Sequence, residues 1–305
     1  TSAGSRIGNS YLAIFQGSIY DVNLARESGV FRGFYPLSET IVTAVPLLFA
    51  GLAVALAFRS GLFNIGAQGQ FIFGAIGASY VGFHYNLPPI IHGLAAILGA
   101  IVLAGLWGGL VGFLKARTGA HEVIVTIMLN YVALNFFTWL LRTPELLLEA
   151  NGGGTPKSDP PADTAMLPTL FGDMYKIHIG IFFAVAAAFI YWLLMDRSAI
   201  GYRFKMVGHN MSAARAAGIK VESTFIWAMA VSAAFAGLAA ANQGLSETGG
   251  ITTSINANIG FDAITVALLG GNSAKGIFAA GLLFGAFKAG SPAMQVAGVS
   301  PEILG

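Results

Sequence analysis

The sequence has no cysteine, which excludes disulfide bonds, thiolate metal sites and cysteine nucleophiles. Charged residues are also scarce. They make up 10% of the 305 residues, against 55% hydrophobic residues and a mean hydropathy of +0.71. That balance excludes an ordinary soluble domain and predicts an integral membrane protein. The 16 Lys and Arg nearly equal the 14 Asp and Glu, and no basic cluster alternates with aromatics, so we expect no nucleic-acid partner.

Sequence patterns for catalysis, metal binding and ATP binding are missing as well. The five histidines are scattered without the spacing of metal ligands, so we expect surface or interfacial histidines and no metal site. No Ser-His-Asp or paired-carboxylate arrangement suggests hydrolysis. The phosphate-binding motif Gly-x-x-x-x-Gly-Lys-[Ser/Thr] is absent, so we expect no bound cofactor and no enzyme activity. The sequence begins at Thr1 without a signal-peptide pattern, and we expect it to start partway into a longer protein.

Long uncharged windows predict six full transmembrane helices, because about 20 helical residues cross a bilayer core. They cover residues 41–58, 62–83, 90–114, 123–141, 177–195 and 225–245. Two shorter stretches, 263–274 and 276–287, flank Lys275 and predict discontinuous helices or a re-entrant hairpin. We therefore expect an all-α polytopic membrane protein, one domain over residues 1–305, with about eight or more transmembrane or half-membrane helices.

The charges of the connecting segments predict the orientation. If the turn at Arg59 is cytoplasmic, the cytoplasmic set holds nine basic and three acidic residues, and the opposite set seven basic and eleven acidic. Such an asymmetry is typical of the positive-inside tendency. It makes residues 1–40 an extracytoplasmic or interfacial segment, 143–176 an extracytoplasmic loop and 196–224 a cytoplasmic loop. The 143–176 loop is either a docking surface for a delivery protein or a plain connector.

Three side-chain amides, Asn64, Gln68 and Gln70, fall within seven residues of the second predicted span. Unpaired amides are costly in lipid, so they must face protein or water. One interpretation is a substrate path lined by a broken helix, and the other is hydrogen bonding that packs the spans together. Asn130 and Asn135 of the fourth span are further candidates for the path, with bonding between spans equally open. The stretch alone favours packing.

Residues 208–219 form the centre of the most basic loop and predict a short helix at the membrane surface. Asn210 is placed to cap its first turn, and Gly218 to end it in the left-handed conformation. Ala213, Ala214 and Ala217 recur at helical spacing and predict one smooth face that fits a groove on a partner. The alternative is an interfacial helix that pairs with anionic lipid.

Several other residues admit two interpretations. Asp262 and Lys288 border the two short stretches; ionisable residues within a membrane are functional candidates, but extension toward the interface explains these two more simply. Asn64-Ile-Gly and Asn258-Ile-Gly each precede a glycine-rich apolar stretch and hint at an internal repeat. Three identical residues are weak support for it.

The stretch Gly-Leu-Phe-Asn-Ile-Gly-Ala-x-Gly-Gln at 61–70 resembles the signature of membrane permease subunits of bacterial nucleoside and simple-sugar ABC importers, relatives of the branched-chain amino acid permeases. Gln68 stands where that family often has Glu. Residues 208–219 are similar to the segment by which these permeases touch their ATPase. The matching positions are Gly208, Asn210, Ala213, Ala214, Ala217, Gly218 and Ile219. The stretch from Gly260 to 285 resembles the family's C-terminal hairpin.

The resemblance implies a multi-pass importer subunit of the bacterial cytoplasmic membrane that moves nucleosides. It implies a cytosolic ATPase that holds ATP and Mg²⁺, an extracytoplasmic substrate-binding protein, and a second permease subunit, either a paralogue or an identical copy. Phe71 is then a candidate for stacking on a nucleobase, although most of the 23 phenylalanines serve lipid contact and core. The open alternatives are ribose or other simple sugars, branched-chain amino acids and, in a different class, an ion-coupled secondary transporter.

Overall fold

The structure is a computed structural model and describes residues 3–144, 146–148, 156–246, 248–255 and 258–296. Within these ranges the regular secondary structure is helical, with three isolated β-bridges and no strand. This confirms the expected all-α class. The helices are α1 (Ala3–Ser18), α2 (Val22–Ser28), α3 (Tyr35–Arg59), α4 (Ala67–His84), α5 (Ile91–Thr118), α6 (Glu122–Leu140), α7 (Gly180–Trp192), α8 (Ala199–His209), α9 (Met211–Ala216), α10 (Val221–Gly244), α11 (Ile259–Leu269) and α12 (Ala274–Val296).

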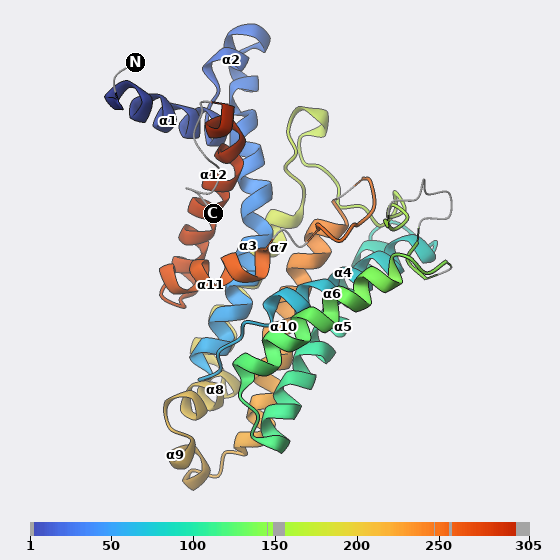
Figure 1. Ribbon diagram of the computed structural model, residues 1–305, viewed down its shortest axis with the longest axis vertical. Coiled ribbons are helices and arrows are strands. Elements are labelled where there is room, and N and C mark those ends of the chain that lie inside the picture. The colour runs from blue at the N-terminus through green and yellow to red at the C-terminus, as the bar shows by residue number, and fades with distance from the viewer. Residues whose placement is uncertain (1–2, 145, 149–155, 247, 256–257, 297–305) are drawn as a thin grey trace.

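Six of these helices are long and apolar enough to cross a membrane: α3 with the 3₁₀ turn η1 (Val30–Phe34) before it, α5, α6, α7 with the π turn η3 (Leu193–Arg197), α10 and α12. Helices α3 and α10 are central, since 78% and 67% of their most apolar windows are buried. Helix α10 packs on α3, α4 and α5, and α12 packs along α3. Figure 1 shows α1, α11 and α12 beside α3, and α4, α5 and α6 in a second group.

The outer helices expose apolar side chains in regular stripes. On α5, the exposed Leu94, Leu98, Val102, Leu106 and Leu110 follow one another every four residues. Residues at this spacing share one helix face. A face of exposed leucine and valine on a helix of this length is suited to lipid contact, because hydrocarbon chains impose no cost on apolar side chains.

The second predicted span begins later than its sequence indicated. Residues 61–66 are not helical, and α4 starts at Ala67 and is 18 residues long. Gly61 has a φ of +72°, and the Asn64 side chain accepts a hydrogen bond from the Gly66 backbone N–H at 2.9 Å. A side chain that bonds its own backbone two residues on forms a turn that competes with helix.

The prediction of two short C-terminal segments is right for one and wrong for the other. Helix α11 has 11 residues, but α12 has 23 and continues past Lys288. Lys288 forms an ion pair with Asp262 of α11, so these two charges neutralise each other within the protein. They pair rather than extend separately to the membrane surface.

The described part of the 143–176 loop is bonded to α3 and to the connection between α10 and α11. The Ser158 backbone N–H donates to the Ile251 carbonyl at 3.0 Å, and Lys176 forms an ion pair of 2.7 Å with Glu39 of α3. Glu39 raises the pKa of Lys176 by bonding its charged form. The prediction of surface or interfacial histidines was wrong for two of them, because His92 and His178 are buried. His92 bonds Thr164 of this loop at 2.7 Å.

Candidate functional site

Three buried polar side chains, Asn64, Gln70 and Ser232, bond one another where α3, α4 and α10 cross. Together with the buried Gln68 in the first turn of α4, we call them the central amide cluster. Asn64 Nδ2 donates to Gln70 Oε1 and to Ser232 Oγ, each at 3.0 Å. Gln70 Nε2 donates back to Asn64 Oδ1 at 3.2 Å. Ser232 Oγ donates to the Ala53 carbonyl of α3 at 2.7 Å. The polar atoms of Asn64 are therefore paired although the side chain is fully buried, as a low-dielectric interior requires.

Gln68 connects this cluster to α11. Its Oε1 accepts a hydrogen bond of 2.9 Å from the Gly260 backbone N–H, in the first turn of α11. A Cβ added at Gly260 would lie 2.4 Å from the Gln68 backbone N, so the two backbones touch only because Gly260 has no side chain. Asn64-Ile-Gly lies just before α4, and Asn258-Ile-Gly leads into the first turn of α11. The first turns of these two helices meet here. A common origin of the two halves stays a prediction.

The other candidate path residues divide between cluster, core and surface. Asn130 of α6 accepts from the Gly69 N–H at 2.8 Å and donates to the Ile65 carbonyl at 3.0 Å, so it adjoins the cluster. Phe71 is buried in the core. Asn135 is exposed and bonds the Tyr131 carbonyl of its own helix. In this conformation the amides bond each other and the backbone, so they hold the helices together.

The segment 208–219 forms the expected short helix, α9. The Asn210 side chain caps it by accepting from the Ala213 N–H at 3.0 Å, and Gly218 has the predicted positive φ, +79°. The prediction of a shared alanine face is wrong, since Ala214 is fully buried while Ala213 and Ala217 are exposed. Adjacent helical residues point about 100° apart. Ala214 therefore faces the body of the protein and not a partner.

The α8–α9 segment contacts the turn that leads from α3 into α4. A Cβ added at Gly208 would lie 2.6 Å from the Gly61 backbone N and 2.7 Å from the Ser60 carbonyl carbon. Asp196 adds ion pairs beside this contact, to Arg59 at 2.5 Å and to Lys205 at 3.5 Å. Figure 1 places α8 at the lower end of α3. The two motifs that the sequence treated separately are thus in backbone contact.

A partly polar cavity of about 210 Å³ between α3, α10, α11 and α12 was missed from the sequence. Its polar lining includes Thr43, Asn242, Gln243, Ser246 and Lys288. Within the described part of the chain, the buried Nδ2 of Asn242 has no hydrogen-bond partner. The sequence did contain a signal for this cavity, because Asn242 and Gln243 are side-chain amides inside the predicted span 225–245. Amides inside a predicted span also singled out Asn64.

Long apolar helices around buried, mutually bonded amides define a polytopic membrane protein. Residues 37–304 match the family described as branched-chain amino acid transport system / permease component, and the chain belongs to this family. It is therefore a multi-pass protein of the cytoplasmic membrane and the permease component of an ABC transport system.

Curated relatives are similar over most of their length. The guanosine ABC transporter permease protein NupP of Bacillus subtilis is 39% identical, over 91% of this chain and 80% of the relative. The nucleoside ABC transporter permease protein NupB of Lactococcus lactis subsp. cremoris is 33% identical over 88% and 75%. The glucose ABC transporter permease protein TsgB13 of Haloferax volcanii is 33% identical over 88% and 73%. No solved structure matches significantly.

Proposed function

We propose that this chain is the transmembrane subunit of an ABC importer that carries nucleosides into the cytoplasm. The names of NupP and NupB support the solute class, and the family supports the role as permease. A separate ATPase binds ATP and Mg²⁺ and supplies the energy, and an extracytoplasmic binding protein delivers the solute. A second permease subunit, a paralogue or an identical copy, completes the membrane part.

The contact between Gly208 and Gly61 is the observation that carries the mechanism. The ATPase docks on the exposed face of α9, where Ala213 and Ala217 lie. Two backbones in direct contact transmit a displacement better than flexible side chains do, because packed interfaces have little free volume. A movement of α9 and α8 therefore reaches the turn before α4, and through it Asn64 in the central amide cluster.

The solute path combines two polar features of the bundle. The cavity lined by Asn242, Gln243 and Ser246 offers amide and hydroxyl groups that suit ribose hydroxyls and base edges. Beyond this cavity, the central amide cluster blocks the solute path, because its polar groups hydrogen-bond one another. Inward opening requires the Asn64 bonds to exchange for bonds to water or solute.

ATP-dependent uptake into proteoliposomes tests the proposal, with the permease, its co-purifying subunits and the delivery protein present. Labelled uridine, adenosine, ribose and leucine are compared. We expect uptake of a nucleoside, and we expect Ala213→Glu to abolish it while the subunit stays folded. As a control, Thr118→Glu places the same charge on the exposed last residue of α5, outside α9, and should leave uptake unchanged.

A simple sugar is the second candidate, because TsgB13 is as similar to this chain as NupB is. Uptake of ribose, but of neither nucleoside, would replace the proposed solute and leave the mechanism in place. Uptake of leucine would favour branched-chain amino acids, the solutes named in the family's description. Uptake that needs an ion gradient and continues without ATP would refute the importer class.

A further inference from the structure

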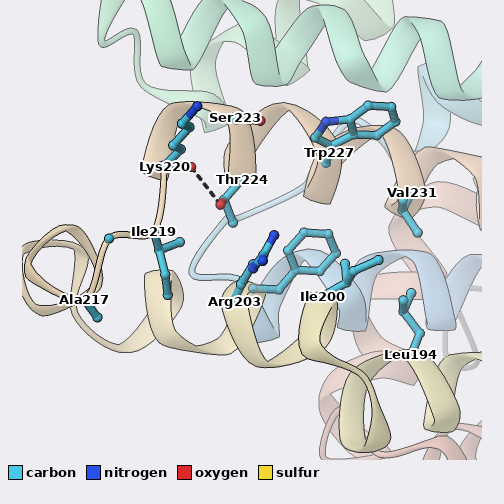
Figure 2. A pocket seen from close by; sticks show the side chains of 12 residues that line it. Leu194, Ile200, Arg203, Ala217, Ile219, Lys220, Ser223, Thr224, Trp227 and Val231 are labelled. Carbon is cyan, nitrogen blue, oxygen red and sulfur yellow. Dashed lines mark hydrogen bonds between the residues drawn. The ribbon is translucent and has the colours of Figure 1, made fainter.

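A groove of about 830 Å³ lies beside the segment that follows α9, between η3, α8 and α10 (Figure 2). Figure 2 shows Arg203 of α8 extending toward α10, on which Thr224, Trp227 and Val231 lie. Residues 217–219 form part of its wall. The groove therefore shares Ala217 with the face to which the ATPase docking is assigned.

The groove changes from polar to apolar along α10. Lys220, Ser223, Trp227 and Val231 are three to four residues apart and share one face of the helix. Val231 is eleven residues beyond Lys220, about 16 Å along a helix axis. Ile200 of α8 and Leu194 of η3 add to the apolar end. An occupant must therefore have a polar end at Lys220 and an apolar part that extends about 16 Å into the membrane.

The polar end carries uncompensated positive charge. Across the described residues, Arg203 and Lys220 form no ion pair, whereas Arg215 pairs with Glu222 at 2.7 Å. Glu222, the acidic residue nearest in sequence, is thus already neutralised. Trp227 is 63% exposed, and exposed tryptophan next to basic residues is typical of the membrane interface. The charge of this end is complementary to an anion.

We propose that this groove binds one acidic phospholipid of the cytoplasmic leaflet, such as phosphatidylglycerol. Its phosphate lies at Arg203, Lys220 and the Ser223 hydroxyl, and an acyl chain lies along Trp227 and Val231. A free phosphate would leave the apolar end uncovered, and a water-soluble subunit does not reach about 16 Å into hydrocarbon. The bound lipid sets the height of residues 217–219 relative to the membrane, and the site does not depend on which solute is carried.

Quenching of Trp227 fluorescence by brominated lipids tests the site directly. The full chain, with Trp107, Trp139 and Trp192 replaced by Phe, is placed in nanodiscs of phosphatidylcholine, and brominated phosphatidylglycerol or brominated phosphatidylcholine is added. One basic residue near an anionic lipid contributes about a fivefold preference, so two contribute about 25-fold. We expect phosphatidylglycerol to quench at a correspondingly lower mole fraction than phosphatidylcholine.

Charge variants separate the groove from general attraction. Arg203→Gln with Lys220→Gln should reduce the preference to about that of bulk lipid, whereas Arg203→Lys with Lys220→Arg should retain it. The matched control is Arg117→Gln with Lys275→Gln, which removes two exposed charges outside the groove and should leave it unchanged. Equal quenching by both lipids, or a preference that survives the first double variant, would overturn the proposal. Loss of subunit association in that variant, measured by size-exclusion chromatography, would assign the groove to a protein interface instead.

Discussion

Replacing Gly208 by Ala perturbs the contact that joins α8 and α9 to the turn before α4. In an open helical position, Gly→Ala stabilises a protein by about 1 kcal/mol. At Gly208 the new methyl group would lie 2.6 Å from the Gly61 backbone N, 0.8 Å short of the 3.4 Å at which ordinary contact begins. The overlapping atoms of residues 59–61 are backbone atoms, so no side-chain rotation can relieve the overlap. Overpacking of this kind costs about 1–3 kcal/mol, so we expect a net loss of about 1 kcal/mol in unfolding free energy.

The functional effect should exceed the loss of stability. Separating α8 from residues 59–61 weakens the path from α9 to Asn64, so ATP hydrolysis should continue while uptake per ATP falls. The assay measures both rates in the same proteoliposomes, together with thermal unfolding in detergent. Gly109→Ala on α5 is the control, because its nearest neighbour is 3.7 Å away and the change should be neutral or stabilising. A Gly208→Ala variant with wild-type stability and wild-type uptake per ATP would refute the reasoning.

Three further predictions concern buried and half-buried polar groups. Ser232→Ala removes a partner of Asn64 and should lower the unfolding free energy by about 1 kcal/mol in detergent; an unchanged value would remove Ser232 from the cluster. Burial lowers the pKa of His178, so the unfolded chain binds its proton more readily and stability should fall as the pH drops below about 6.5. Thermal unfolding at several pH values should show this dependence weakened in His178→Gln. Lys288→Met leaves Asp262 unpaired and should destabilise by about 1–3 kcal/mol, and adding Asp262→Asn should restore part of the loss; a merely additive double variant would argue against the pair.

Features set by near neighbours in the chain were predictable. The α9 cap at Asn210 and its end at Gly218 depend on residues within one turn, so local rules suffice. The lengths of the outer spans follow from uninterrupted apolar runs, since lipid contact selects composition over about 20 residues. The membrane class and five of the spanning helices rest on such local signals.

Features set by contacts between distant segments were not predictable. The burial of Ala214 depends on which side of α9 faces the protein, and the spacing of three alanines does not contain that information. The length of α12 depends on Asp262, which neutralises Lys288 in the middle of a helix and so removes the reason to end it there. Ser232 carried no signal at all, because a serine in an apolar span bonds its own helix as readily as a neighbour.

The central amide cluster fits both roles that the sequence left open, once its energy is considered. Hydrogen bonds between membrane helices average about 0.6 kcal/mol, because water or other polar groups replace the lost partners. Three bonds of the cluster join segments distant in the chain, namely Asn64–Ser232, Ser232–Ala53 and Gln68–Gly260, and together they therefore contribute about 2 kcal/mol. That is enough to favour one closed arrangement and within the few kcal/mol that separate interconverting conformations. Leucines at these positions would close the bundle more tightly, but they would offer an entering polar solute no group to exchange bonds with. Under the proposed function, these amides therefore hold the closed state weakly enough for the partner ATPase to open it.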